Sequence, residues 1–370
     1  MRSVTESTPP TYRLTEEQAL LRDAVRILAD ERVAPRAAEI DRTGEFPQDL
    51  RELLSLCLAI EQLSRACATT GLIVAVQELG SLPLLISGSP EQHERWIPDL
   101  ASGRKLIAFA LTEAEAGSDV AAIRTTAVRD DDDYVLTGSK RFISHGSVAD
   151  LISVFAVTDP GADRHARMSC FLVEVPTDGF SVARLEHKMG LRGSPTAELV
   201  FDRIRVPAAN RIGDEGAGFD IAMRTFERSR PGIAAQAVGI AQGALEAATA
   251  YASDRRQFGK RIGDLQMVAA MLADMDAAPE AARQLLYKAC VEIDAGSPDA
   301  GRWSAMCKLV AGDAAMRVTT DAVQVLGGYG YIDEFPVERM MRDAKITQLY
   351  EGTQQIQRLV VARALLGRDG

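Results

Sequence analysis

The hydrophobic pattern changes twice along the chain, from a helical spacing to an alternating one and back. From Leu14 to about Leu106 apolar residues recur every three or four positions, which predicts amphipathic helices. Pro47 and Pro83 are expected to separate these helices, because proline interrupts helical hydrogen bonding. Ser89 is a suitable N-cap for a helix over residues 90–100.

Between Ala108 and about Gly218, apolar and polar residues alternate over short runs, which predicts strands. The runs richest in strand-forming residues cover 134–137, 151–157, 169–175 and 197–201. Four carboxylates at 130–133 are expected at an exposed hairpin tip, since a calcium loop needs a longer alternating pattern of ligands. This part of the chain therefore predicts a small β domain.

From Phe219 onward the helical spacing returns, and residues 296–298 and 327–328 are expected to separate the helices of a bundle. The order helices, strands, helices differs from the alternating order of a doubly wound nucleotide-binding sheet. We therefore expect a multi-domain α and β protein. It divides into a flexible N-terminal arm at 1–13, a helical domain at 14–107, a central β domain at 108–218 and a helical bundle at 219–370.

Length and composition narrow the class of protein. A chain of 370 residues is expected to form two or three structural regions around a shared interior. With 46% hydrophobic and 25% charged residues, and no uninterrupted apolar run long enough for a bilayer, we expect a globular protein without a membrane span. A formal net charge of -10 argues against nonspecific nucleic-acid binding.

Two kinds of motif are missing from the sequence. The first dozen residues have neither the apolar core of a signal peptide nor the arginine-rich character of a transit peptide, so a bacterial-type cytoplasm is the expected location. The five cysteines form no C-x-x-C pair and the four histidines form no H-E-x-x-H pattern, so we expect no metal.

Glu351 is the strongest candidate for acid–base chemistry. It lies between an apolar run that ends at Tyr350 and the Gly352-Thr353 pair, which is expected to begin a helix. A carboxylate at such a junction can point inward, where a low dielectric raises its pKa toward that of a useful general base. From its position alone, a solvated loop glutamate is the alternative, since glutamate is almost never fully buried.

Two segments of the β region suggest a flat ligand. Gly117-Ser118 form a turn whose backbone N–H groups can hold a phosphate or a ring edge, although the same residues are common in ordinary turns. Phe142 and Ser144 are two residues apart, so on one strand both side chains face the same side and can cover a ring. The alternative is a half-buried phenylalanine beside an incidental serine.

A third segment suggests that the ligand carries phosphates. Arg255, at the start of a basic run that includes Phe258, offers a forked cation suited to a pyrophosphate. Gln324 and Gly327-Gly328 follow later in the chain, where the glycines permit a close approach of the backbone. Most short basic runs are solvated helix ends, which is the alternative for residues 255–261.

Together and in this order, these segments resemble the acyl-CoA dehydrogenases, and the resemblance covers nearly the whole chain. The most specific matches are residues 111–119, 255–260, 324–330, 339–344 and 350–357. The resemblance implies an N-terminal α-helical domain, a central β-barrel domain and a C-terminal four-helix bundle. It also implies a homotetramer built as a dimer of dimers.

FAD is the cofactor that the resemblance implies, bound between the β domain and the bundle and completed by a neighbouring subunit. The FAD-binding positions are Thr112, Gly117, Ser118, Phe142, Ser144, Arg255, Phe258, Gln324, Gly328, Thr353 and Gln355. Of these, the four from Arg255 to Gly328 would come from across the dimer interface. The positions implied for the acyl-CoA substrate are Ser118, Arg230, Tyr350 and Gly352.

Glu351 matches the family's catalytic base. In the family, this base removes the α-proton of an acyl-CoA thioester while the β-hydrogen leaves as hydride to flavin N5, which gives the trans-2-enoyl-CoA. An electron-transfer flavoprotein then accepts the electrons. Some relatives place the base immediately before the arginine that matches Arg230; this position is Ser229 here, which cannot act as a base. Glu351 is therefore the sole candidate.

The chain departs from the family pattern at several positions. Ala114 replaces the usual Pro, Phe142 replaces the usual Trp, and Ser144-His145 replace Thr-Asn, so contacts with the flavin ring are expected to differ. Ser55 runs directly into Leu56, where relatives carry a loop that helps to shape the acyl pocket. The resemblance therefore predicts neither the length nor the branching nor the ring content of the acyl group.

Two alternatives stay open at this point. The first is an enzyme of the same fold that acts on acyl-carrier-protein substrates, or a flavin oxidase or monooxygenase. The second belongs to another class, a non-catalytic helical subunit of a hetero-oligomer, although the presence of Glu351, Arg255 and Gln324 argues against it.

Overall fold

The computed structural model describes residues 16–28, 30–31, 34–36, 38–39, 42 and 56–367. The expected N-terminal arm, Pro47 and the chain up to Ser55 lie outside the described residues. The N-terminal helices are α1 (Glu16–Leu28), α3 (Leu56–Ala66), α4 (Ala68–Ser87) and α5 (Pro90–Ala101). Ser89 caps α5 as expected, because its hydroxyl accepts from the Gln92 N–H while the Gln92 side chain accepts from the Ser89 N–H.

The middle of the chain forms one eight-stranded sheet in the order β6-β7-β3-β2-β4-β5-β8, with β1 pairing in parallel with β4. Its strands are β1 (Ile107–Ala110), β2 (Thr126–Asp130), β3 (Asp133–Ser144), β4 (Leu151–Val157), β5 (Met168–Glu174), β6 (Phe180–Leu185), β7 (Thr196–Pro207) and β8 (Arg211–Ile212). The β2–β3 hairpin turns at Asp131 and Asp132, where the acidic run was expected. Every residue of β4 is buried, so this strand lies at the centre of the domain.

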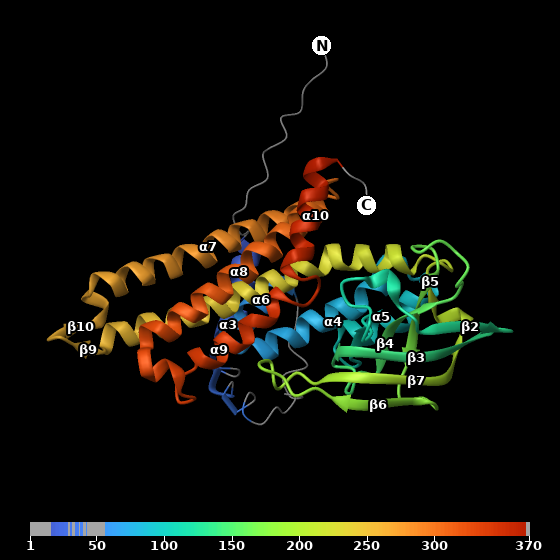
Figure 1. The fold of residues 1–370 in the computed structure, drawn as a ribbon, viewed down its shortest axis with the longest axis horizontal. Coiled ribbons are helices and arrows are strands. Elements are labelled where there is room, and N and C mark those ends of the chain that lie inside the picture. The colour runs from blue at the N-terminus through green and yellow to red at the C-terminus, as the bar shows by residue number, and fades with distance from the viewer. Residues whose placement is uncertain are drawn as a thin grey trace, which may run out of the picture.

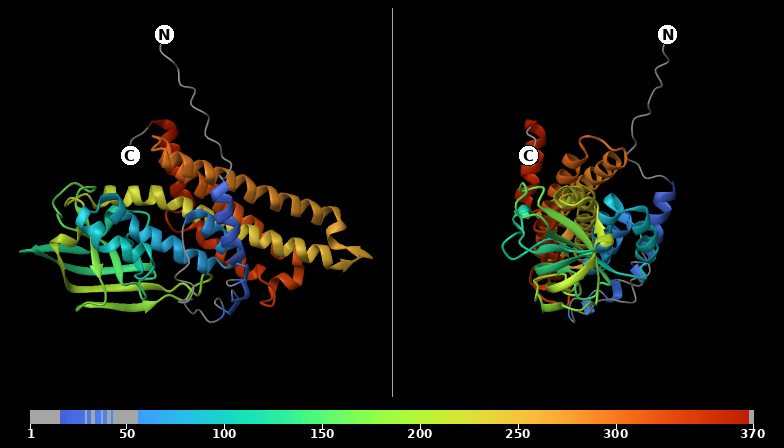
Figure 2. Two further views of the ribbon diagram at one scale, coloured as in Figure 1. Left: turned by 180° about the vertical axis from the view of Figure 1, so that it is seen from behind. Right: turned by 90° about the vertical axis from the view of Figure 1, so that its right-hand side faces the viewer.

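The C-terminal helices are α6 (Gly218–Asp254), α7 (Gln266–Asp294), α8 (Ala300–Leu326), α9 (Val337–Ala344) and α10 (Gln354–Leu366). A small hairpin of β9 (Arg256–Gln257) and β10 (Lys260–Arg261) joins α6 to α7. Figures 1 and 2 show α6, α7 and α8 extending away from the sheet, with this hairpin at the far tip. Buried residues of α3, α4, α6, α7 and α8 share one apolar core.

The observed order of elements confirms the expected fold class, with helices at both ends of the chain and strands between them. The expectation that Pro83 separates two helices is wrong, because Pro83 lies inside α4 and is buried. The apolar residues on both sides of Pro83 pack into the core, and this packing holds the helix together despite one lost hydrogen bond.

By length and composition alone, α4 could cross a membrane. Its most apolar stretch of 18 residues has a mean hydropathy of 1.5, and 72% of that stretch is buried inside the protein. The buried core helix of a globular protein passes the same test, so α4 is only weak evidence for a membrane span.

Candidate active site

Glu351 lies in a tight turn between α9 and α10. Its backbone has a φ of 50° and that of Gly352 a φ of 90°, both in the left-handed region. The φ at position 352 favours glycine, because L side chains rarely adopt it, and a Cβ there would also lie 2.5 Å from the Gln357 side-chain nitrogen. Thr353 then caps α10, its hydroxyl accepting from the Ile356 N–H at 3.3 Å. The sequence Glu-Gly-Thr therefore forms a strained turn followed at once by a capped helix.

Two buried side chains hold the backbone of this turn. The Lys308 ammonium on α8 donates to the Gly352 carbonyl at 2.6 Å. The Gln357 amide donates to the carbonyls of Glu351 at 3.1 Å and of Gly352 at 2.9 Å. Because Lys308 and Gln357 are both fully buried, the position of the turn is fixed from inside the bundle.

The carboxyl group of Glu351 contacts the middle of α6. The Ser229 hydroxyl donates to Glu351 Oε2 at 2.5 Å, and Ser229 is buried. Burial raises the pKa of Glu351 to about 7, although the Ser229 hydrogen bond and the charges of Lys308 and Arg230 lower it in part. A carboxyl group with a pKa near neutrality is well matched to general-base catalysis.

Tyr350 and Arg230 both lie close enough to this carboxyl group to interact with its charge. The Tyr350 hydroxyl donates to the Gln236 side chain, and the Gln236 amide donates to the Ala68 carbonyl at 3.0 Å, which links the turn to α6 and α4. Arg230 is buried, with its guanidinium 6.0 Å from the Phe226 ring centre. Burial lowers the pKa of Arg230, and the negative charge of Glu351 acts in the opposite direction.

A cavity of about 340 Å³ lies between the sheet and α9, beside Tyr350. Phe142 and Ser144 of β3 line it, together with Leu72 of α4. Alternation along a regular strand, which was expected to put Phe142 and Ser144 on one side, is not the full explanation of their position. Phe142 has a φ of 59°, and the β3–β7 register is irregular between Lys140 and Ile143, so simple alternation does not apply here.

Sequence reasoning missed much of the wall of this cavity. Residues 186–191 line it, as do Arg342 and Lys345. Arg342 donates to the Met189 carbonyl at 2.9 Å, and the Leu191 N–H donates to Asp343 at 2.6 Å, so the loop before β7 is tied to α9. The basic residues of the loop were the available signal, but only the fold brings them to α9.

The loop from Thr112 to Ser118 sits beside β3 and does not line this cavity. Lys140, which is fully buried, donates to the Leu111 carbonyl at 3.0 Å and to the Glu113 carboxylate at 2.8 Å. Burial lowers the pKa of Lys140 to about 8, and Glu113 partly offsets this. Gly117 and Ser118 are exposed, and a Cβ on Gly117 would meet no atom within 4 Å.

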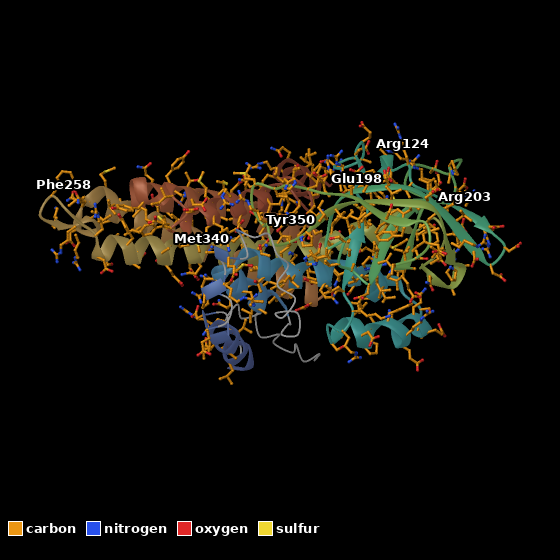
Figure 3. The ribbon with its side chains drawn as sticks, turned by 90° about the horizontal axis from the view of Figure 1, so that it is seen from below. Arg124, Glu198, Arg203, Phe258, Met340 and Tyr350 are labelled. Carbon is orange, nitrogen blue, oxygen red and sulfur yellow. The ribbon has the colours of Figure 1, made fainter. Side chains whose placement is uncertain are left out.

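The remaining predicted positions lie elsewhere on the molecule. Arg255 and Gly328 line a second cavity, of about 500 Å³, where the Arg255 guanidinium lies 5.5 Å from the Tyr329 ring centre. Phe258 is 89% exposed, and Gln324 is exposed on α8. In Figure 3, Phe258 lies at one end of the molecule, Arg203 of the sheet lies at the other, and Tyr350 lies between them.

Two positions remain. Thr353, besides capping α10, is partly exposed, and Gln355 is exposed in the first turn of that helix. One chain therefore gathers Glu351, Tyr350, Gly352, Arg230, Phe142 and Ser144 in one region and places Arg255, Phe258, Gln324 and Gly328 in another.

In the part of the chain that the structure describes, no three His, Cys, Asp or Glu side chains lie close enough together to bind a metal ion. The absence of a metal stays a prediction.

Models of known protein families match almost the whole chain. Models of the acyl-CoA dehydrogenase N-terminal domain match residues 15–56 and 51–104, that of the middle domain matches 108–204, and that of the C-terminal domain matches 216–366. The chain belongs to the acyl-CoA dehydrogenase family. It is an oxidoreductase, and its cofactor is FAD.

Individual acyl-CoA dehydrogenases and their structures agree with this assignment. The probable acyl-CoA dehydrogenase FadE25 of Mycobacterium tuberculosis is 46% identical over 378 residues, which cover 96% of this chain and 97% of that protein. Butyryl-CoA dehydrogenase of Megasphaera elsdenii has a TM-score of 0.92 at 39% identity, with 96% of this chain and 100% of that chain covered. A structure described as the electron transferring flavoprotein of Acidaminococcus fermentans contains a chain with a TM-score of 0.94 at 41% identity, with 97% and 100% covered.

The residues present fit the two ends of an FAD molecule. Phe142 gives the 340 Å³ cavity an apolar face and Ser144 a hydroxyl, which suits a flat ring with polar edges. At the second cavity, Arg255 supplies a cation, and a Cβ at Gly328 would meet no atom within 4 Å, which suits phosphates close to the backbone.

Proposed function

We propose that this acyl-CoA dehydrogenase converts an acyl-CoA thioester to the trans-2-enoyl-CoA, with Glu351 as the base that removes the α-proton. The observation that carries the proposal is the Glu351 carboxyl group itself. It accepts a 2.5 Å hydrogen bond from Ser229, its pKa is raised to about 7, and it follows Tyr350, which lines the 340 Å³ cavity. Near pH 7 a large fraction of this carboxyl is ionised and able to accept a proton.

The α-carbon of a thioester is far too weakly acidic for a carboxylate in water, so the site must stabilise the developing enolate. Hydrogen-bond donors aimed at the thioester oxygen in a site that excludes water supply several kcal/mol of such stabilisation. We assign the backbone N–H of Glu351 to this role, because Lys308 and Gln357 fix the turn that carries it. When bound, the flavin of FAD accepts the β-hydrogen as hydride.

We propose that two subunits complete each FAD site, within a homotetramer built as a dimer of dimers. Within one chain, Phe258 lies at the end of the molecule far from the sheet, whereas Phe142 and Ser144 lie on the sheet beside Tyr350. A second copy in the opposite orientation would bring its Arg255, Phe258, Gln324 and Gly328 to the first copy's site, as expected for a two-fold dimer. We place the enzyme in the cytoplasm.

We propose an electron-transfer flavoprotein as the electron acceptor. The similarity to a chain in the structure named for such a flavoprotein supports this assignment. Rapid oxygen consumption in its place would indicate a flavin oxidase or monooxygenase. A preference for an acyl group on a carrier protein would indicate a dehydrogenase of acyl-carrier-protein substrates. Steady-state assays with the flavoprotein or oxygen as acceptor, and with CoA or carrier protein bearing the acyl group, separate these enzymes from an acyl-CoA dehydrogenase.

Glu351→Gln tests the role of the base. We expect the variant to purify with FAD and to be yellow, because glutamine keeps the size of the side chain. When a panel of straight, branched and ring-bearing acyl-CoAs is added without oxygen, the wild type should bleach. The variant should bleach slower by roughly 10²- to 10⁴-fold, the usual contribution of a general base. Bleaching of the variant at the wild-type rate would remove Glu351 from the mechanism.

A further inference from the structure

Lys188 brings a positive charge to the cavity beside Phe142, and the mechanism above does not use it. It lies in the loop before β7 and lines the 340 Å³ cavity together with Phe142 and Ser144. Its ammonium group donates to the Ser194 carbonyl at 2.7 Å and forms no ion pair within 4.0 Å in the described part of the chain. An ammonium group has three N–H donors, so two remain for a ligand or for water.

The other charges in the wall of this cavity are paired or lie in solvent. The wall has four further side chains that can carry a charge, namely Glu186, His187, Arg342 and Lys345. Glu186 accepts from Arg184 at 2.7 Å, and Arg342 donates to Glu338 at 2.8 Å. The other two are exposed, so solvent screens them, whereas Lys188 is partly buried. The charge of Lys188 is therefore the least compensated one in the described wall.

The titratable groups around Lys188 leave it as the cation on this side of the cavity. Burial lowers the pKa of Lys188, and the charges of Asp343 and Glu186 oppose this effect and favour the ammonium form. Asp343 is engaged elsewhere, since it accepts from the Leu191 N–H at 2.6 Å. His145 is fully buried, and burial together with the charge of Lys188 lowers its pKa to about 3, so it is neutral at pH 7.

A cation in this wall acts differently on the two redox states of a bound flavin. Hydride transfer from the β-carbon adds two electrons and one proton to a ring in the cavity, while the α-proton goes to Glu351. The ring therefore gains one negative charge. A fixed cation in a site sheltered from water stabilises this charge more than it stabilises the neutral oxidised ring. Charged side chains around a flavin are one of the means by which a protein sets its potential.

We propose that Lys188 raises the reduction potential of the bound FAD through its positive charge in the wall of the ring cavity. The inference rests on the location of the ring beside Phe142 and Ser144, and it does not depend on the role of Glu351. A neutral side chain at position 188 makes the cofactor harder to reduce.

The test is a potentiometric titration of the purified holoenzyme with dithionite and redox dyes, without oxygen and without an acyl-CoA. Lys188→Met removes the charge and keeps the length of the side chain. We expect the equilibrium constant for two-electron reduction to fall at least about tenfold, which moves the potential about 30 mV more negative. Lys188→Gln, which keeps a neutral N–H donor, should show a similar shift. Lys188→Arg, which keeps the charge, should stay near the wild type.

Lys345→Met removes an exposed lysine from the wall of the same cavity and is the matched control, with a potential expected near the wild type. Unchanged potentials in both neutral Lys188 variants would overturn the inference. So would equal shifts in Lys188→Met and Lys345→Met, because the effect would then be one of overall charge. If Lys188 only holds its loop through Ser194, Lys188→Met would lose FAD while the potential of the remaining FAD stayed the same, which also overturns the inference.

Phe142→Leu tests the location of the ring separately. It removes the aromatic face of the cavity, so the visible absorption spectrum of the bound FAD should change. An unchanged spectrum would place the ring outside this cavity, and the inference would fail together with its premise. A changed spectrum with unaltered potentials in the Lys188 variants would overturn the role of Lys188 alone.

Discussion

The ionisation of Glu351 depends on residues that are far from it in the sequence. Ser229, which donates to its carboxyl group, is 122 residues away. Lys308, which donates to the backbone carbonyl of Gly352, is 44 residues from that glycine. The Glu-Gly-Thr sequence was enough to nominate Glu351 as a base. Its partners could not be predicted, because a serine in a helix carries no local sign of a carboxylate on another element.

Ser229→Ala should shift the pH dependence of the reaction. Glu351 must be ionised to accept a proton, so kcat/KM is expected to rise with pH through about 7. The Ser229 hydrogen bond favours the ionised form and lowers the pKa of Glu351, so its loss raises that pKa. The acidic limb of the kcat/KM profile should therefore move to higher pH, as measured by steady-state rates from pH 5.5 to 9.

Ser229→Thr keeps the hydroxyl and is the control. It should retain the wild-type profile if its extra methyl group is accommodated beside the turn. An Ala variant whose limb coincides with the wild type, at normal FAD content, would show that the hydrogen bond does not set the ionisation of the base.

At the scale of elements, most of the fold followed from pattern, and the errors have physical causes. The expected runs at 151–157 and 169–175 correspond to β4 and β5, because buried strands are continuous apolar runs. By contrast, β6 is almost entirely exposed and β1 has only four residues, so neither gave a clear signal. Pro83 was misread because burial of α4 outweighs the local preference of proline.

The ion pair between Lys140 of β3 and Glu113 fixes the loop that carries Gly117 and Ser118. Although burial acts to raise it, the pKa of Glu113 is held below its ordinary value by Lys140. The Lys140 side chain is 0% exposed and that of Glu113 is 10% exposed. Without Lys140, the Glu113 carboxylate keeps only the backbone N–H groups of Arg124 at 2.7 Å and Thr125 at 3.0 Å as partners. Removing one partner of a buried ion pair typically costs about 3–5 kcal/mol, because the charge of the other is no longer compensated.

Lys140→Met should therefore lower the free energy of unfolding by about that amount and weaken FAD binding through the displaced loop. Urea unfolding and the ratio of flavin to protein absorbance measure the two effects. The double variant Lys140→Met, Glu113→Gln should recover much of the stability, since no buried charge is left and the glutamine carbonyl can still accept from the backbone N–H of Arg124 or Thr125. Equal stability of the single and double variants would show that the pair is not coupled.

At the scale of the whole molecule, the candidate residues fall into two groups that one chain keeps apart. Tyr350, which precedes Glu351, lies between the sheet and the far end of the molecule, where Phe258 lies (Figure 3). Arg255 caps the C-terminal end of α6, next to the β9–β10 hairpin at that end (Figure 1). Hydrophobic pattern and motif spacing contain no information on which groups meet in an assembly. Only the resemblance to a family suggested that the second group serves a neighbouring subunit.

Complementation between two inactive variants tests whether Arg255 acts in the site of its partner. Glu351→Gln lacks the base, and Arg255→Glu reverses the charge at the phosphate cavity, so each homo-oligomer should be inactive. In a two-fold dimer with one chain of each kind, the Arg255→Glu chain keeps its own base and receives an intact Arg255 from its partner. One of the two sites is then complete, and activity should return to about half of the wild-type value. Differently tagged chains, co-expressed and purified over both tags, provide mixed tetramers. Some of these contain unmixed dimers, so half of the wild-type activity is the upper limit for the preparation.

The arrangement within one chain predicts a different result. If Arg255 served the site of its own chain, every site in the mixed dimer would lack either the base or the cation, and no activity would return. Mixing the two purified homo-oligomers without exchange of chains is the control and should be inactive in either case. FAD content does not separate the two arrangements, because in either one the mixed dimer has one site with an intact Arg255. A flavin-to-protein ratio between those of the two parents is the control that shows that the mixed dimer binds FAD. A mixed dimer that binds FAD at this intermediate ratio and has no activity would rule out a site shared across the interface through Arg255.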